Sequence, residues 1–204
     1  VFTGALSRVV NENVGAYALT KGTLTAGGNY AITLVPNNFA ITPAALTITA
    51  DNQPKVYGAA LPTLTASYSG FVNGDTSVSL TTQPTVTTTA TAASPVNTYP
   101  ITASGAVDSN YTITYAPGIL NVTPAALTVT TLNATKVYGD VLPALNVSYS
   151  GLVNGNLAPA TLPTIVTTGT QSSSVGSYPI TASLAADPNY TITYNNIGNL
   201  AVTP

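Results

Sequence analysis

The side chains in this sequence best suited to acid–base chemistry are carboxylates and lysines, because the chain contains no histidine and no cysteine. General acid–base or nucleophilic catalysis needs a titratable group beside a partner group. The six carboxylates are instead scattered singly along the chain, at Glu12, Asp51, Asp75, Asp108, Asp140 and Asp187. We interpret them as turn formers and surface charges. We therefore predict that the chain is not an enzyme, with no catalytic residues, no cofactor and no cofactor-binding residues.

Calcium binding is a second chemistry that the acidic and amide side chains could support. A calcium site needs about six to eight oxygen ligands, usually from clustered Asp, Asn and Glu. The nearest approach is Asn73-Gly74-Asp75, but its later counterpart, Asn154-Gly155-Asn156, lacks the charge. Both tripeptides have the composition of a tight turn. We predict turns at these positions and no metal site.

Two lysines occur in a repeated Lys-Val-Tyr-Gly motif, in which Lys55 precedes Tyr57 and Lys136 precedes Tyr138 by two residues. Residues two apart share a face of an extended segment. We expect each lysine stem to lie along the tyrosine ring, with its ammonium group in water. The alternative is an intramolecular amide bond to an Asn, which would need a buried acid beside the pair, and the sequence shows none.

The tyrosines are the remaining candidates for a binding role, because twelve of them recur along the chain and exposed rings could stack on sugars. Two groups, however, each share one strand face with an isoleucine: Tyr111 and Tyr115 with Ile113, and Tyr190 and Tyr194 with Ile192. We expect these four rings to pack in the core, with hydroxyls bonded to backbone groups at its edge.

The charge and composition exclude several classes of partner. Only four residues are basic and six are acidic, so the dense positive field of a nucleic-acid-binding protein is absent and we predict no nucleic acid partner. No apolar run reaches about 18 residues, and we predict no direct membrane insertion. The lack of Cys, His, Met and Trp, with abundant Thr, Ala, Val, Gly and Asn, resembles an exported bacterial repeat protein. We therefore expect an extracellular or bacterial cell-surface location.

The chain is a tandem array with a period of about 80 residues. Residues 110–129 recur in part at 29–48 and at 189–204, each time beginning with Asn-Tyr. This pattern predicts three domains: residues 1–43 form the C-terminal half of a partial repeat, and residues 44–124 and 125–204 form complete β-rich repeats. We call these the first, second and third repeats. The first lacks the strands that would cover its apolar face, so we expect it to be the least stable unless it packs on its neighbour.

Alternating apolar and polar residues predict six short strands in each complete repeat. In the second repeat four are expected at 46–50, 64–68, 85–89 and 99–103, and a hairpin over 111–122 that turns at Pro117-Gly118 supplies the other two. Pro100 and Pro179 lack an amide donor, which places their strand at a sheet edge or at its start. At one position of the repeat the first and third copies have Gly15 and Gly176, and the second has Asn97. Because asparagine tolerates the left-handed region best after glycine, we expect a positive φ at all three residues.

These strands and the absence of helical spacing predict an all-β fold. We favour tandem small β-sandwich domains of immunoglobulin-like form. The alternative is a β-grasp-like domain, whose short helix would have to lie within residues 71–80. Only Ala125 and Ala126 separate Pro124 from the next alternating run, which leaves no room for a flexible linker. We expect stiff coupling of successive repeats in an elongated array.

Four short motifs recur in fixed order: KVYG, SYSG-(F/L)-VNG, V-(N/G)-x-YPITAS and NYTITY. With these motifs the chain resembles the MBG-type (YGX) repeats of very large bacterial surface proteins, including filamentous-haemagglutinin-like adhesins. The resemblance implies a non-catalytic stalk or spacer that extends a distal binding region of an adhesin from the cell, with neighbouring repeats of the same chain as partners. The alternative is a weak multivalent carbohydrate- or protein-binding module, whose partners would be host or environmental glycans or surface proteins.

Overall fold

The computed structural model describes all residues from 1 to 204. The chain is built of β-strands, and its single helical turn is the 3-10 helix η1 (Ser77–Ser79). No helix in it is both long and apolar enough for a membrane span. The strands and turns form two compact units, one comprising residues 1–51, 65–87 and 102–117, and the other residues 52–64, 88–101 and 118–204. The domain boundaries predicted after residues 43 and 124 stay a prediction.

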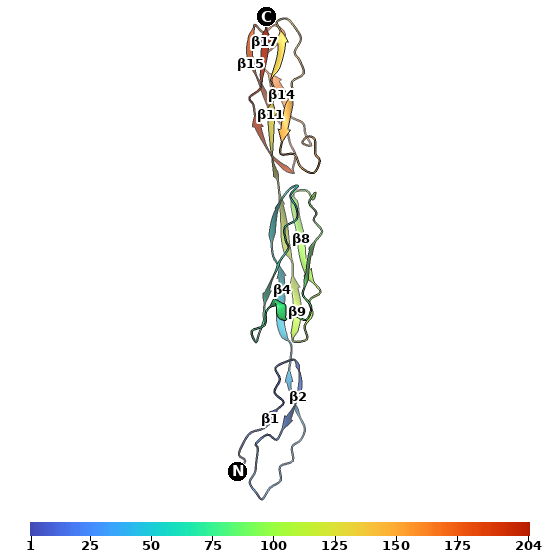
Figure 1. Cartoon of the computed structure of the whole chain (residues 1–204), viewed down its shortest axis with the longest axis vertical. Helices are drawn as coiled ribbons and strands as arrows, with labels where there is room; N and C mark the ends of the chain where they lie inside the picture. The colour runs from blue at the N-terminus through green and yellow to red at the C-terminus, as the bar shows by residue number, and fades with distance from the viewer. The chain divides into compact units, whose positions relative to one another are not determined.

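The first repeat lies wholly in the first unit and forms one antiparallel sheet of three strands (Figure 1). In spatial order these are β1 (Ser7–Arg8), β2 (Gly15–Thr20) and β3 (Asn38–Ile41). None of residues 1–43 is buried, because the sheet has no second layer of its own. This lack of a core is the physical reason to expect the first repeat to be the least stable.

The first unit also contains a three-stranded sheet of the second repeat, with the order β6 (Ala66–Ser69), β4 (Ala44–Ala50) and β9 (Tyr111–Ala116). The central strand β4 pairs antiparallel with β6 and parallel with β9. Leu46, Ile48 and Ala50 are buried while the residues between them are partly exposed, as the two-residue period of a strand requires.

The other sheet of the second repeat has four strands, in the order β5 (Gln53–Val56), β10 (Gly118–Thr123), β8 (Asn97–Ser104) and β7 (Thr85–Thr88). Strand β10 pairs parallel with β5 and antiparallel with β8. The terminal strand of the repeat is therefore held between two partners from distant parts of its sequence.

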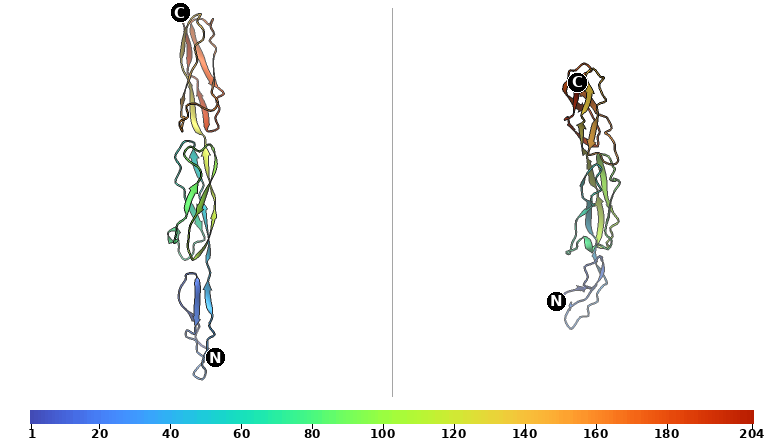
Figure 2. Two further views of the ribbon diagram at one scale, coloured as in Figure 1. Left: turned by 90° about the vertical axis from the view of Figure 1, so that its right-hand side faces the viewer. Right: turned by 45° about the horizontal axis from the view of Figure 1, so that its top comes forward.

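The third repeat lies wholly in the second unit and has the same two strand orders. One sheet contains β13 (Val147–Ser150), β11 (Ala125–Thr131) and β16 (Tyr190–Asn195); the other contains β12 (Ala134–Val137), β17 (Asn199–Thr203), β15 (Gly176–Ser183) and β14 (Thr164–Thr167). The strands of both sheets run roughly along one direction (Figures 1 and 2). Their inward residues form one buried core: Leu127, Val129, Ile180, Leu200 and Val202. The prediction of an all-β fold of small tandem β-sandwiches is confirmed.

The predicted hairpin at Pro117-Gly118 is wrong. Strand β9 ends at Ala116 and pairs with β4, whereas β10 begins at Gly118 and pairs with β8 and β5, so the two strands belong to different sheets. Pro117 has no amide donor and ends the first ladder, after which the chain passes to the second sheet. Strands β4 and β5 change sheets in the same way, and β5 raises the number of strands in a complete repeat to seven.

The predicted edge position of Pro100 and Pro179 is also wrong, because their strands β8 and β15 each have two neighbours. Pro179 pairs with Asn199 of β17, and pairing with β14 begins only at Ile180. The carbonyl of Pro100 accepts a bond from the Thr88 hydroxyl (2.8 Å). In a strand, the nitrogen and the carbonyl of one residue face the same neighbouring strand. The proline nitrogen, which cannot donate, therefore faces β7 or β14 at a point where the backbone ladder with that strand has not yet begun.

Positive φ angles occur in the predicted tight turns at residues 73–75 and 154–156. The expectation of a positive φ at Gly15, Asn97 and Gly176 is wrong, because these residues begin strands and have no positive φ. Asn73 and Gly74 have φ of 57° and 80°, the left-handed pair of a tight turn, which confirms the prediction there. The β-grasp alternative requires a short helix within residues 71–80. The structure has only the three-residue 3-10 helix η1 there.

Candidate functional site

The repeats are joined by strand-to-strand connections of one or two residues. In the first unit β3 ends at Ile41 and β4 begins at Ala44; in the second unit β10 ends at Thr123 and β11 begins at Ala125. We call these the first and second junctions. Pro43 and Pro124 occupy the connections and restrict the residue before them to extended conformations.

An asparagine of the following repeat crosses each junction. At the first junction the side-chain carbonyl of Asn110 accepts a hydrogen bond from the backbone N–H of Val14 (2.8 Å). At the second junction Asn189 accepts from the backbone N–H of Val96 (2.9 Å). Val14 and Val96 occupy equivalent positions in the repeat, as do Asn110 and Asn189. The same bond therefore recurs at both junctions.

An aspartate two residues earlier holds each junction asparagine. The carboxylate of Asp187 accepts bonds from the backbone N–H groups of Asn189 (2.8 Å) and Ala160 (3.0 Å). Asp108 bonds the backbone N–H groups of Asn110 (2.8 Å) and Thr81 (3.3 Å) in the same way. Such Asx turns fix the local backbone, so each asparagine is directed before it meets the preceding repeat.

Aromatic packing adds to the hydrogen bond at the second junction. The rings of Tyr57 and Tyr190 lie 5.5 Å apart between centroids, with an interplanar angle of 88°. The Tyr190 hydroxyl also accepts a bond from the Val153 backbone N–H (3.0 Å), which ties the Val153 turn to the same ring. A Cβ atom added to Gly58 would lie 2.4 Å from a methyl group of Val153, so this contact requires a glycine.

The first junction has a different, more polar surround, because the first repeat contains no Lys-Val-Tyr-Gly motif. Here the Tyr111 ring meets Phe71 edge-on at 5.6 Å, and its hydroxyl donates to the Asp75 carboxylate (2.7 Å). Glu12 pairs with Arg8 (2.8 Å). A cavity of about 440 Å³ at this junction is lined by Glu12, Asn13, Val14, Ile41, Thr42, Ala44, Val72, Asn73, Asp75, Asn110 and Tyr111.

The carboxylates remain scattered in the structure, and no three acidic side chains gather as a metal site would require. Asp75 serves as the acceptor for Tyr111 and Asp51 for the Thr65 hydroxyl (2.7 Å). The tight turn of residues 73–75 is closed by a bond from the Asp75 N–H to the Val72 carbonyl (2.9 Å). The Asx turns of Asp108 and Asp187 and the tight turn at Asp75 agree with the interpretation as turn formers, whereas Asp51 accepts a bond from a residue 14 positions away.

The expectation for the two lysines is wrong, because their ammonium groups are not in water. Lys55 is 4% exposed and Lys136 is 6% exposed. Lys55 donates to the carbonyl of Ala92 (2.8 Å), and Lys136 donates to those of Asp140 (2.9 Å) and Gln171 (3.1 Å). Neither lysine forms an ion pair with an acid. Each therefore ties its own strand to a distant loop through backbone acceptors, and burial lowers the pKa of Lys55.

The expectation for the tyrosines is confirmed for Tyr111 and Tyr190, which are buried. It is wrong for Tyr115 and Tyr194, which lie at the edge of the core and are 40% and 36% exposed. The edge hydroxyls accept bonds from the backbone N–H groups of Ala106 (2.8 Å) and Ala185 (2.6 Å) respectively. The hydroxyls of all four tyrosines thus bond backbone groups as expected, but only two of the rings pack in the core.

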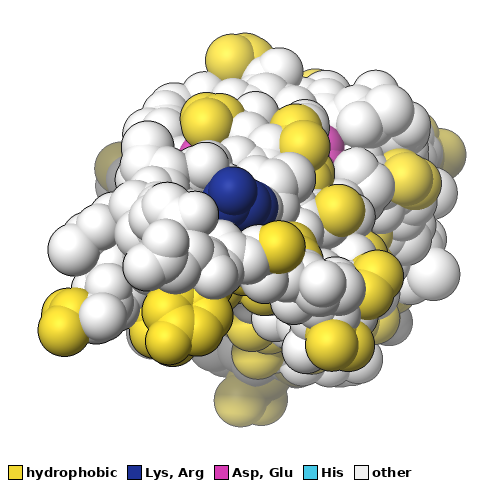
Figure 3. Space-filling view, turned by 90° about the horizontal axis from the view of Figure 1, so that it is seen from below, with side chains coloured by type: hydrophobic (Ala, Val, Ile, Leu, Met, Phe, Trp, Pro, Cys, Tyr) yellow, Lys and Arg dark blue, Asp and Glu magenta, His cyan; other side chains and the backbone are white.

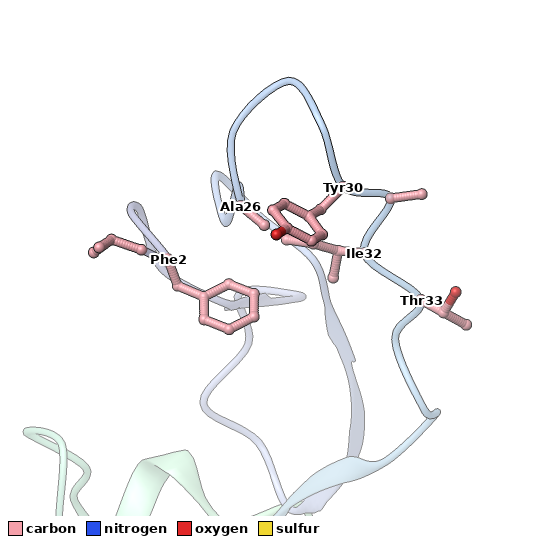
Figure 4. A pocket seen from close by; sticks show the side chains of 7 residues that line it. Phe2, Ala26, Tyr30, Ile32 and Thr33 are labelled. Atoms are coloured by element: carbon pink, nitrogen blue, oxygen red, sulfur yellow. The ribbon is translucent and has the colours of Figure 1, made fainter.

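The two most exposed aromatic residues lie in the first repeat, where Phe2 is 68% and Tyr30 76% exposed. Both rings point into a cavity of about 450 Å³ that Ala26, Ile32 and Thr33 also line (Figure 4). On the face seen in Figure 3 the basic side chains form one small spot, with hydrophobic side chains scattered around it.

The junction asparagines were missed as functional residues, although their sequence carried a signal. Asp-x-Asn-Tyr occurs at 108–111 and again at 187–190, whereas the first repeat has Gly27-Gly28 before its Asn-Tyr. A recurring Asp-x-Asn is the composition of an Asx turn. The partner of each asparagine lies more than 90 residues away in the sequence, which no local pattern identifies.

Comparison with known proteins agrees with the tandem organisation. No curated protein and no solved structure gives a match. A family model described as the MBG domain (YGX type) matches residues 1–40, 46–121 and 127–201. Three successive matches cover nearly all of the sequence, and the chain thus belongs to the MBG domain family of the YGX type.

Proposed function

We propose that this chain is a non-catalytic stalk segment of a large bacterial surface adhesin, located outside the cell and extending a distal binding region away from it. The family supports the coarser part of this proposal, since MBG domains are repeat modules of large surface proteins and are typically structural. The finer part rests on the junctions.

The observation that carries the proposal is the recurrence of one junction bond. The Val14 N–H donates to Asn110 over 2.8 Å, and the Val96 N–H donates to Asn189 over 2.9 Å. Each bond lies beside a strand-to-strand connection of only one or two residues. A spacer must transmit its direction from one repeat to the next, which requires a fixed joint rather than a flexible linker. A directed hydrogen bond beside a proline-restricted connection supplies such a joint.

Small-angle X-ray scattering of the whole chain tests this function. We expect an extended distance distribution for the native sequence. Insertion of Gly-Ser-Gly-Ser after Pro124 should broaden that distribution while each repeat stays folded, because the insertion frees the joint without interrupting a strand of either repeat. The same insertion after Gly28, in an exposed turn of the first repeat away from both junctions, is the matched control. A compact distribution for the native chain would contradict the stalk proposal.

A second candidate, a weak carbohydrate-binding module, is favoured by the exposed rings of Phe2 and Tyr30 beside their cavity (Figure 4). Aromatic faces flanking a cavity are suited to the apolar faces of sugar rings. Binding to a glycan array that is lost in Phe2→Ala and Tyr30→Ala, but kept in Tyr138→Ala, would support it. No binding by the native chain, or equal loss in all three variants, would exclude it.

A further inference from the structure

The third repeat presents a surface whose equivalent in the second repeat is covered. We call it the trailing face and define it by Tyr138, Gly139 and the backbone N–H of Val175. The equivalent residues of the second repeat are Tyr57, Gly58 and Val96. Those three are contacted by Tyr190, Val153 and Asn189 of the third repeat, respectively.

The difference in exposure is confined to the contact. Tyr57 is 7% exposed and Tyr138 is 58% exposed, yet the neighbouring residues Val56 and Val137 are 48% and 47% exposed. The two copies of the Lys-Val-Tyr-Gly segment therefore differ in burial at the tyrosine, which Tyr190 covers in the second repeat, and at the glycine, which Val153 contacts there. The trailing face leaves a large aromatic surface in water that its counterpart buries.

The trailing face already has the conformation that the occupied face adopts. Gly139 has a φ of 88° and Gly58 of 80°. A Cβ atom at Gly139 would meet no atom within 4 Å, so the space that Val153 fills beside Gly58 is open there.

The segment before Val175 is also fixed in the same way as the segment before Val96. The hydroxyl of Tyr178 donates to the carbonyl of Ser174 (2.9 Å), and that of Tyr99 donates to Pro95 (3.0 Å). Both bonds span four residues and hold the loop that carries the junction N–H. Little reorganisation would accompany docking at Val175, which reduces its entropic cost.

We infer that the trailing face is a docking surface suited to an MBG repeat linked to it in tandem, through the residues of that repeat equivalent to Val153, Asn189 and Tyr190. The occupant is recognised by an Asp-x-Asn-Tyr turn: its asparagine carbonyl accepts from the Val175 N–H and its tyrosine ring packs edge-on against Tyr138. A valine equivalent to Val153 fills the space beside Gly139. This inference goes beyond the stalk proposal, because it concerns recognition between repeats and holds whether or not the array is extended.

The test appends a second copy of residues 125–204 directly after Pro204, which reproduces the spacing at Pro124. Amide hydrogen exchange is followed by NMR, with Val96 as the internal standard. In the native chain the Val96 amide should exchange slowly and the Val175 amide rapidly. In the extended chain we expect exchange at Val175 to slow by about tenfold, the effect of one modest hydrogen bond.

Two variants of the appended copy identify the cause. Asn189→Ala in that copy should restore rapid exchange at Val175. Asn195→Ala in the same copy removes an exposed asparagine outside the junction and should leave the protection intact. Chemical shifts of the core residues report whether each appended copy is folded.

Three outcomes would overturn the inference: unchanged exchange at Val175 in an extended chain with a folded appended copy, equal effects of the two asparagine variants, or concentration-dependent protection of Val175 in the native chain. The last would mean that a separate copy, rather than a tandem repeat, occupies the face. A compact scattering profile of the native chain would contradict the stalk proposal alone. The hydrogen-exchange result at Val175 could still be interpreted, because it reports contact between repeats and not the extension of the array.

Discussion

The rings of Tyr57 and Tyr190 meet almost at a right angle, with an interplanar angle of 88° and 5.5 Å between their centroids. An edge-to-face pair contributes about 0.5 to 1.5 kcal/mol beyond the burial of its area. The pair joins two repeats, so the stability of the second unit depends on a contact that neither repeat could make alone.

Replacement of Tyr57 by alanine should therefore destabilise the second unit by about 3 kcal/mol, the usual cost of deleting a buried aromatic ring. Tyr138→Ala removes the same side chain from an exposed site and should change stability by less than about 0.5 kcal/mol. The shift in the midpoint of urea unfolding measures both. Equal losses would mean that the Tyr190 contact does not account for the burial of Tyr57.

Leu184 has a φ of 63°, and its counterpart Gly105 has 79°. The left-handed region costs a residue with a Cβ atom about 1 to 2 kcal/mol, a cost that glycine avoids. Leu184→Gly should thus raise the stability of the third repeat by about 1 kcal/mol, because the leucine side chain is exposed and little packing is lost. The reciprocal change Gly105→Leu should lower the stability of the second repeat. Calorimetric unfolding measures both, and a destabilised Leu184→Gly variant would contradict the argument.

Burial raises the pKa of Tyr68, Tyr111 and Tyr149 above the ordinary value of 10.0. For Tyr111 burial is the largest cause, a bond from the Val72 backbone opposes it, and the Asp75 carboxylate raises the pKa further. Above pH 10.0 the unfolded chain loses protons that the folded chain retains, so stability should fall as the pH rises through the folded pKa values.

This alkaline loss can be measured by urea unfolding on either side of pH 10.0, the ordinary value for tyrosine. Tyr149→Phe should reduce the loss, whereas Tyr30→Phe, at an exposed ring, should not. Identical profiles for all three proteins would show that the Tyr149 hydroxyl does not contribute.

Lys55 should give a pH dependence of the opposite sign. Burial lowers its pKa below the ordinary value of 10.5, so between the folded pKa and 10.5 the unfolded chain binds more protons. Stability contributed by this group should rise with pH in that window. Lys55→Met keeps an unbranched apolar stem and should abolish the rise, while Lys21→Met, at an exposed site, should preserve it. A rise that persists in Lys55→Met would have to come from another group.

The alternation of residues was enough to place most strands, since a strand with one buried face reveals itself by a period of two. The predicted strand at 46–50 lies within β4 and that at 99–103 lies within β8. The turn of Asn73 and Gly74 was also predictable, because few residues other than asparagine and glycine adopt positive φ readily.

Strand pairing could not be read from the same pattern, because alternation identifies the buried face but not the neighbouring strand. Pro117-Gly118 has the composition of a turn, and only the partners of β9 and β10 show that the chain changes sheets there. The buried ammonium of Lys55 was unpredictable for a similar reason. Its acceptor is a backbone carbonyl at Ala92, 37 residues away, and every residue type carries such a carbonyl.

The parallel pairing of β12 with β17 determines how the third repeat would respond to tension. The register runs from Ala134 opposite Leu200 to Val137 opposite Thr203, between a strand near the start of the repeat and its final strand. Opposed forces applied at Ala125 and Pro204 would slide these parallel strands along each other and load their hydrogen bonds together, whereas a terminal antiparallel hairpin would open one bond at a time. Each complete repeat therefore has the strand arrangement of a mechanical clamp, and force spectroscopy should find that Val202→Pro, which interrupts this final strand, lowers the unfolding force far more than the same change at Val166 in β14.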